Sequence, residues 1–304
     1  MKKVIVTTTI NPITKALNKF QQFSDWDLVV VGDKKTPVPY TLDKGIYISP
    51  QMQEEFDKEL SDSIGWNCIQ RRNFGLLWAL KMGADIIATI DDDNIPYDHW
   101  GTDLLIKKDV PVKYYDTELP VFDPIGATNI KHIWHRGYPL ELIPERDYSN
   151  VSVKSIHCDI QADFWNGDPD IDAVCRMEHR PSCTFDEKGF PFSSNTFSPF
   201  NSQNTFITKK VLPHYFLFPH IGRMDDIWAA YYVEAKGFKV VYQRPSVFQD
   251  RNVHNLIKDM KAEYIGYEHN LGLITDLKKD PENIIKFLPE PSIKAFELYK
   301  RHFK

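Results

Sequence analysis

Short apolar runs that end in polar residues recur along the first third of the chain. They cover residues 3–9, 27–31, 46–48 and 85–90. Continuous apolar or β-branched runs of this length are typical of strands buried on both faces of a sheet. Residues 13–20 and 66–83 lie between these runs and carry apolar residues at helical spacing. Strands that alternate with helices predict an α/β fold with a mostly parallel, doubly wound sheet.

The rest of the chain is less regular. Residues 100–203 are rich in aromatic residues, Pro, Asn and Asp without a clear period, so we expect irregular lids or binding loops there. Regular patterns then return as a strand at 204–207, a helix at 221–237, a strand at 239–242 and an amphipathic terminal helix at 291–304.

Three consecutive carboxylates, Asp91 to Asp93, follow the apolar run 85–90. Adjacent carboxylates repel one another, and Mg²⁺ or Mn²⁺ would relieve that repulsion, since such ions are commonly held by one or two carboxylates together with substrate phosphates. In open α/β sheets the ligand crevice lies at the carboxyl ends of the strands. The alternative is an acidic turn before Pro96, because Asp is a common turn former.

Other polar residues follow the neighbouring predicted strands. Thr8 and Thr9 end the first run, Asn11 stands where a helix N-cap is expected, and Asp33 follows the second run. The ends of parallel strands meet at one edge of a sheet, so we expect these side chains to lie at the edge that carries the aspartate triplet.

Two further charged pairs lie near the starts of predicted helices. Arg71 and Arg72 form either a solvated face or a contact to pyrophosphate, which suits guanidinium geometry. Asp225 and Asp226 open the helix at 221–237, where the helix dipole favours acidic residues. Adjacent residues on a helix point about 100° apart, so we expect one of the two to cap the helix and the other to face a ligand.

Composition and charge narrow the class of protein. Hydrophobic residues make up 42% and charged residues 26% of the 304 residues, which excludes long disorder. The net charge of −5 offers no basic surface to a nucleic acid. No apolar run approaches a membrane span and no signal-peptide core opens the chain, so a cytoplasmic protein is expected. Neither GxGxxG nor GxxxxGK[ST] occurs, so the usual evidence for dinucleotide binding or P-loop chemistry is missing.

Several spaced segments resemble known families. The chain contains IDDDN at 90–94, HRGYP at 135–139, IGRMDDIWA at 221–229 and AEYIG at 262–266. These segments resemble the reversibly glycosylated polypeptides, which include the UDP-arabinopyranose mutases. The chain also contains TTTINPITKA at 7–16, VVGDKKTP at 30–37 and RRNFGLLWALKMGAD at 71–85, which look like the related STELLO-type glycosyltransferase group.

The resemblance implies a glycosyltransferase A (GT-A) fold that binds a nucleoside-diphosphate sugar and a divalent metal. The expected single domain spans 1–304, with a nucleotide-binding half at 1–100, a sugar and acceptor half at 101–267 and a C-terminal helical extension at 268–304. The expected nucleotide-binding residues are Thr8, Thr9, Asn11, Asp33, Arg72, Asp91 and Asp92. The expected ligands of Mn²⁺ or Mg²⁺ are Asp91, Asp93 and His254, with Gln249 as the alternative third ligand. The expected catalytic residues are Asp226, Asp225 and Arg136. Resemblance to other transferases of this fold favours Asp226 as the reactive carboxylate and leaves Asp225 as the helix cap, although the sequence also permits the reverse.

The leading function expected is metal-dependent transfer of a sugar from a UDP-sugar to an unidentified acceptor, a glycan or another small hydroxyl compound. The metal would neutralise charge on the departing diphosphate. An aspartate of the second pair would either take the acceptor's proton or stabilise positive charge at the anomeric carbon. One alternative is a UDP-sugar mutase, since Arg136 matches the arginine that is reversibly glycosylated in the mutases. Another is a UDP-sugar-binding protein without turnover.

Overall fold

One mixed β-sheet runs through the computed structural model, which describes residues 1–250 and 255–303. The strand order is β3-β2-β1-β4-β10-β8-β11-β9-β6-β7, and β5 pairs with β11 beside this path. The strands are β1 Lys3–Thr9, β2 Asp27–Gly32, β3 Ile46–Ile48, β4 Ile86–Ile90, β5 Asn94–Pro96, β6 Asp109–Tyr115, β7 Val151–His157, β8 Ile160–Gly167, β9 Phe192–Ser194, β10 Asn204–Thr208 and β11 Val240–Gln249.

The first four strands in space, β3, β2, β1 and β4, are mutually parallel. This arrangement confirms the predicted α/β fold, and the order is the one in which doubly wound sheets begin. The strands that follow are mixed, because β10 runs antiparallel to both β4 and β8 while β8 and β11 are parallel. The carboxyl ends of β1, β2 and β4 therefore share one edge with the amino end of β10.

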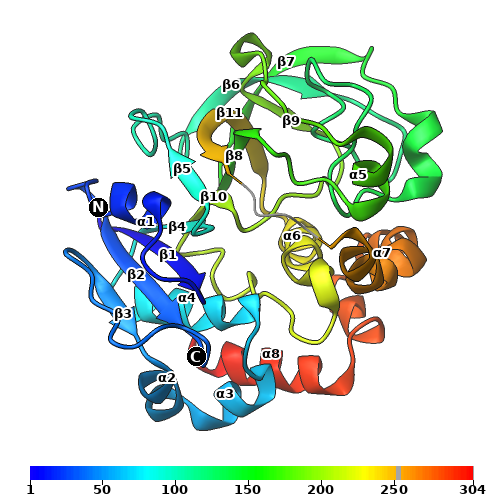
Figure 1. The fold of residues 1–304 in the computed structure, drawn as a ribbon. Helices are drawn as coiled ribbons and strands as arrows, with labels where there is room; N and C mark the ends of the chain where they lie inside the picture. The colour runs from blue at the N-terminus through cyan, green and yellow to red at the C-terminus, as the bar shows by residue number, and fades with distance from the viewer. Residues whose placement is uncertain (251–254, 304) are drawn as a thin grey trace.

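Helices lie around the sheet (Figure 1). The α-helices are α1 Lys15–Phe20, α2 Pro50–Phe56, α3 Lys58–Ile64, α4 Arg72–Lys81, α5 Ala173–His179, α6 Asp225–Ala235, α7 Leu256–Leu277 and α8 Glu290–Arg301. The 3₁₀ turn η1, Ile69–Arg71, precedes α4, and η4, Gly222–Met224, precedes α6. Within the described residues, no helix has both the length and the apolarity that a membrane span requires.

The helix α6 lies at the centre of the molecule (Figure 1). Nine of its first residues, from Asp225 to Val233, are buried, so its sequence shows little difference between faces. The N-terminus of α6 lies near the edge where β4 ends, because Asp226 accepts a hydrogen bond from the backbone N–H of Ser202, just before β10. Burial all round thus places two carboxylates inside the protein, where their charge must be compensated.

Several sequence-based expectations are wrong in detail. Residues 100–203 contain four strands, β6 to β9, and the helix α5; all seven residues of β7 lie at the sheet edge and only one is even half-buried, so no apolar period marks this strand. The strand expected at 239–242 extends to Gln249. The N-cap of α1 is Thr14, whose hydroxyl accepts from the Leu17 N–H, and not Asn11.

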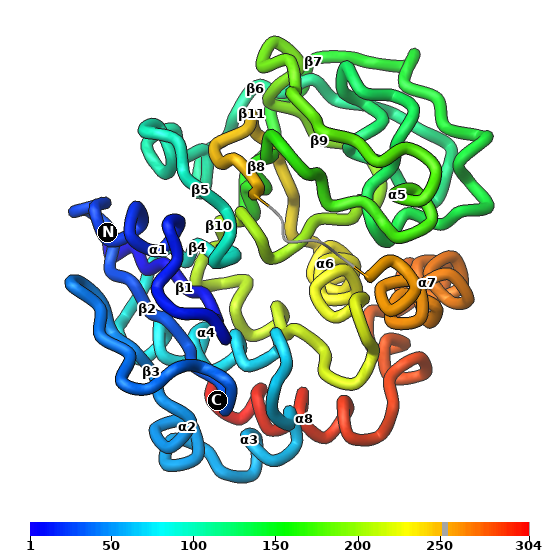
Figure 2. Tube along the Cα trace, in the orientation of Figure 1, coloured from blue at the N-terminus to red at the C-terminus, as the bar shows by residue number. Residues whose placement is uncertain are grey.

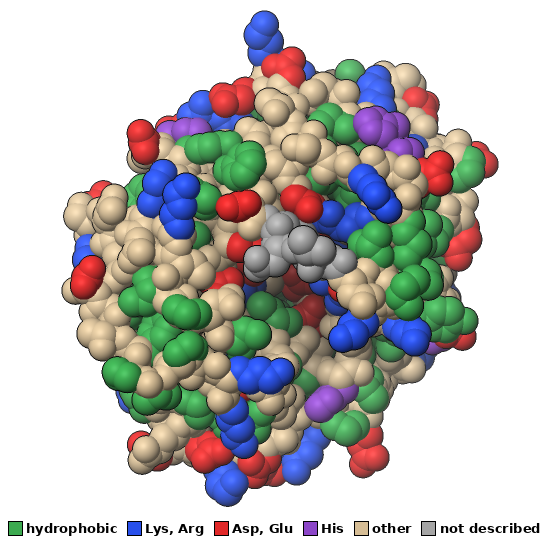
Figure 3. Space-filling model, in the orientation of Figure 1, with side chains coloured by type: hydrophobic (Ala, Val, Ile, Leu, Met, Phe, Trp, Pro, Cys, Tyr) green, Lys and Arg blue, Asp and Glu red, His purple; other side chains and the backbone are tan. Residues whose placement is uncertain are grey.

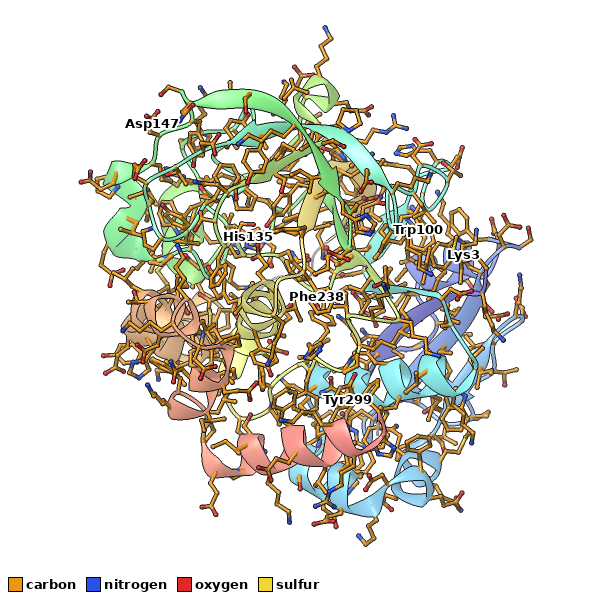
Figure 4. The ribbon with its side chains drawn as sticks, turned by 180° about the vertical axis from the view of Figure 1, so that it is seen from behind. Lys3, Trp100, His135, Asp147, Phe238 and Tyr299 are labelled. Carbon is orange, nitrogen blue, oxygen red and sulfur yellow. The ribbon has the colours of Figure 1, made fainter. Side chains whose placement is uncertain are left out.

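The C-terminal helix α8 returns to the N-terminal half. It packs against α3, and the tube view shows it passing along that side of the molecule (Figure 2). Tyr299 of α8 is fully buried and donates to the carbonyl of Leu212 (Figure 4). The expected amphipathic terminal helix is confirmed, and on its buried face Phe296 packs edge-on against Tyr232 of α6.

Candidate functional site

A cavity of about 210 Å³ lies at the shared edge of the sheet. The space-filling view shows a hollow near the middle of one face, with acidic side chains around it (Figure 3). Its charged lining residues are Asp91, Asp93, Arg136, Arg223, Asp225 and Asp226. The structure therefore brings Asp91 and Asp93 of the aspartate triplet together with the second acidic pair, which lies more than 130 positions away in sequence. We call this space the acidic cavity.

Arg72 connects the end of β4 to the residue before β10. Its side chain is fully buried; Nη2 lies 2.5 Å from Asp91 Oδ1 and Nη1 donates to the Ser202 carbonyl at 2.7 Å. Arg71 is also fully buried and donates to Gln53, Ser61 and the Gly65 carbonyl. A solvated face is thus excluded for both arginines, and Arg71 is part of the scaffold beneath the cavity.

Arg136 lies between two buried carboxylates. Its Nε and Nη2 donate to the two oxygens of Asp170, each at 2.9 Å, and its Nη1 and Nη2 donate to Asp226 at 3.0 and 3.3 Å. Nη1 also donates to the Arg223 carbonyl, so all five N–H groups of the guanidinium are used. Burial lowers the pKa of Arg136, but Asp170 and Asp226 outweigh it and hold that pKa well above its usual value.

Asp226 is fixed on both sides. Besides Arg136, its Oδ2 accepts from the backbone N–H of Ser202 at 2.9 Å and from the Ser202 hydroxyl at 3.1 Å. Ser202 also accepts from Arg72, so it joins Asp226 to the Asp91 contact. These four contacts hold the Asp226 carboxylate as a counter-ion of Arg136 and fix its position.

Asp225 has a different environment. Gln70 Nε2 donates to its Oδ2 at 2.9 Å. Burial, reinforced by the neighbouring Asp226, raises the pKa of Asp225 to about 7. The expected capping role of Asp225 is wrong, because α6 starts at Asp225 itself and Met224 occupies the N-cap position. A capping residue stands just before the first helical residue. Asp225 is itself the first helical residue of α6, and it lines the cavity instead.

The three aspartates after β4 point to different partners. Asp92 accepts from the Thr9 hydroxyl and from Asn11 Nδ2. Asp93 accepts from Gln249 Nε2 at 2.8 Å, and both residues line the acidic cavity. The amide oxygen of Gln249, Oε1, is buried and has no hydrogen-bond partner within residues 1–250 and 255–303.

These oxygen donors fit a hard divalent cation that shares its coordination with a phosphate ligand. Two carboxylates and an unpaired amide oxygen are the donor types that Mg²⁺ uses in such sites. No set of three His, Cys, Asp or Glu residues arranged to hold a metal occurs among the described residues, so the protein part alone does not form a closed cage. The expected ligand His254 lies outside the described residues.

A second cavity, of about 250 Å³, adjoins the first, and Ile69 lines both. Thr8, Thr9, Asn11 and Asp92 line it as expected, together with Asn67 and Cys68. Asp33 lies behind its wall, where its carboxylate accepts from the N–H groups of Asn67 and Cys68 at 2.8 and 3.0 Å. We call this second space the neutral cavity, because Asp92, its one charged lining residue, is held by Thr9 and Asn11.

Four residues that build the site had no role assigned from the sequence. Ser202 stands before β10, and because β10 is antiparallel to β4 its start lies at the functional edge; polar residues before a strand are the signal for such a case. Gln70 precedes α4 and stands directly before the segment at 71–85. Arg223 precedes α6 and lies within the segment at 221–229. Asp170 lies between β8 and α5, in residues where the sequence shows no pattern.

Comparisons with known proteins give distant similarity. No family model matches the chain. Over 185 residues, 57% of this chain, it is 28% identical to "Probable glycosyltransferase STELLO1" and 26% identical to "Probable glycosyltransferase STELLO2", both from Arabidopsis thaliana. The match spans about a quarter of the length of these curated relatives, 24% of each. The similarity to the STELLO-type group is thereby confirmed, whereas the resemblance to the reversibly glycosylated polypeptides stays a prediction.

Among solved structures, the chain is similar to "Crystal Structure of A197 from STIV", with a TM-score of 0.36 and 11% sequence identity. That similarity covers 81% of this chain and 83% of the other.

Proposed function

We propose that this chain is a glycosyltransferase that moves a sugar from a nucleoside diphosphate to a hydroxyl acceptor. The observation that carries the proposal is the acidic cavity, in which Asp91 and Asp93 face the same space as Asp225 and Asp226. The similarity to two proteins named probable glycosyltransferases supports it. The expected GT-A fold and UDP as the nucleotide belong to the same proposal.

The two cavities suggest how the donor lies. The nucleoside occupies the neutral cavity, and the diphosphate and sugar pass Ile69 into the acidic cavity. Four aspartates line the acidic cavity against two arginines, and Arg136 is committed to Asp170 and Asp226. A diphosphate would meet net negative charge there, so its binding requires a cation.

Asp91, Asp93 and Gln249 Oε1 are the proposed protein donors to Mn²⁺ or Mg²⁺. When bound, such an ion neutralises charge on the leaving diphosphate. Gln249 is held for this task by Nε2, which donates to Asp93 and leaves Oε1 as the acceptor end of the amide. Gln249, rather than His254, is therefore our proposed third ligand.

Asp225 is the proposed general base. Its carboxylate takes the proton of the acceptor hydroxyl while the hydroxyl oxygen forms a bond to the anomeric carbon. The bond from that carbon to the phosphate oxygen breaks, and its electron pair leaves with the diphosphate. A base with a pKa of about 7 is matched to this task near neutral pH. This assignment reverses the sequence-based choice of Asp226, whose four hydrogen bonds fix it as a charge that orients Arg136 and Ser202.

The mutase alternative needs Arg136 to act as a nucleophile toward the sugar. A guanidinium with five hydrogen bonds and a raised pKa has no available lone pair, which favours transfer over the mutase. The non-catalytic alternative uses the same two cavities and differs only in turnover.

A product assay separates the three functions. The protein is incubated with Mn²⁺ and each of several UDP-sugars, and the nucleotides are resolved by NMR. We expect release of UDP that depends on Asp225, and D225N serves as the matched control because it keeps the shape of the side chain. An isomeric UDP-sugar without free UDP would establish the mutase instead. Tight UDP binding without either product would establish a binding protein.

A further inference from the structure

The polar groups around the neutral cavity have internal partners, with one exception. The Thr8 hydroxyl donates to the Val31 carbonyl at 2.9 Å, and Thr9 and Asn11 both donate to Asp92. The side-chain amide of Asn67 lines the same cavity and makes no hydrogen bond to any residue that the structure describes. Asn67 is thus the lining residue that keeps both a donor and an acceptor for a ligand.

The backbone holds Asn67 in place before any ligand arrives. Its φ angle is +59°, in the left-handed region that few residues other than Gly and Asn adopt readily. Asp33, only 2% exposed, accepts from the Asn67 N–H at 2.8 Å and from the Cys68 N–H at 3.0 Å. A side chain on a fixed backbone loses little entropy when it binds, so Asp33 acts here as a positioning residue.

We propose that Asn67 recognises the nucleobase of the donor as uracil. Its Oδ1 accepts from the N3–H of the ring, and its Nδ2 donates to the neighbouring carbonyl oxygen. An amide presents an acceptor and a donor side by side, which complements the adjacent N–H and C=O of uracil. The inference rests on the proposed function, since it requires a nucleoside diphosphate whose phosphates enter the acidic cavity through the wall at Ile69.

A structural reason for asparagine exists as well, because the left-handed backbone favours it without any ligand. Two variants separate these explanations. N67G keeps the positive φ and removes the amide. N67D keeps the side-chain shape and tolerates the same backbone region, but it replaces the donor with an acceptor that repels a carbonyl oxygen. A thermal unfolding midpoint near that of the natural protein shows that each variant is folded.

The test is calorimetry in Mn²⁺ with UDP, 3-methyl-UDP and inorganic pyrophosphate. We expect N67G and N67D to bind UDP about tenfold more weakly, a change of about 1.4 kcal/mol, and to bind pyrophosphate as the natural protein does. Methylation of N3 removes the hydrogen that Asn67 accepts. It should therefore weaken binding to the natural protein about tenfold and weaken binding to N67G very little.

Equal UDP affinity in N67G and the natural protein would overturn the inference while the proposed function stands. Equal losses for UDP and pyrophosphate would also overturn it, because they would indicate damage to the whole site. Tighter binding of GDP than of UDP would overturn the choice of uracil. If the natural protein bound pyrophosphate but no nucleotide, the proposed function and this inference would fail together.

Discussion

Replacing Arg136 with methionine should destabilise the protein strongly, and the size of the effect follows from its partners. The change removes the cation from between Asp170 and Asp226, whose side chains are 0% and 6% exposed. Breaking a buried ion pair by removing one partner costs about 3–5 kcal/mol, because the remaining charge is left uncompensated. Methionine fills most of the volume, so the loss is mainly electrostatic.

The assay is thermal unfolding followed by calorimetry or fluorescence. At about 2 °C per kcal/mol for a chain of this size, R136M should lower Tm by about 6–10 °C. Arg301 provides the matched control, since its side chain is 63% exposed and its nearest carboxylate is 3.5 Å away. R301M should shift the free energy of unfolding by less than about 1 kcal/mol.

The dependence on pH gives the sign of the effect. Without Arg136, the carboxylates of Asp170 and Asp226 are left buried without their cation, so the penalty is fully present at high pH, where both are ionised. Protonation removes that penalty as the pH falls, and the gap in Tm between R136M and the natural protein should narrow from pH 8 to pH 5. The double variant R136M/D170N should regain part of the loss. A drop in Tm below about 2 °C, or a gap independent of pH, would refute the assignment of Arg136 as the buried counter-ion.

Three further predictions concern the chemistry of the acidic cavity. D225N should lower turnover by about 10²-fold or more, while UDP affinity and Tm are retained. The rate of the natural protein should rise through pH 7, because the Asp225 carboxyl, with its pKa raised to about 7, loses its proton there. The pH–rate profiles of both proteins check this. EDTA should weaken UDP binding by the natural protein about tenfold or more, whereas D93N should already bind weakly and lose little more, which calorimetry measures. Arg223 lines the cavity, and its Nε donates to Glu263 at 2.8 Å. It should contribute to pyrophosphate affinity, so R223M should bind pyrophosphate several-fold more weakly and bind uridine with unchanged affinity. An equal loss of affinity for both ligands would place Arg223 in the scaffold.

The position of the site could be predicted because a change from apolar to polar residues marks the carboxyl end of each parallel strand. Each of β1, β2 and β4 is apolar along its length and turns polar at its carboxyl end, so Thr9, Asp33 and Asp91 could be assigned to one edge. The strand β10 is antiparallel to β4, so its amino end, and not its carboxyl end, lies at that edge. The polar residues that mark the site therefore come before β10. Ser202 was missed because only residues after strands were considered.

The partners of long side chains could not be predicted in the same way. Arg72 reaches Asp91, 19 positions away, and Ser202, 130 positions away, and sequence spacing contains no information on such contacts. The edge strand β7 was missed for a related reason, because both of its faces meet solvent and no burial pattern constrains its residues.

The contacts that the sequence could not supply give the two aspartates of α6 different environments. Asp226 was the natural choice from resemblance, yet its two oxygens are taken up by the Arg136 guanidinium and by Ser202. Asp225, one position earlier, is rotated about 100° around the helix axis and meets the uncharged amide of Gln70 instead of a guanidinium. Burial without a cation is what raises a carboxyl pKa. The same helix start therefore holds one carboxylate that anchors Arg136 and one, Asp225, whose pKa burial raises to about 7, and the difference between them arises from tertiary contacts alone.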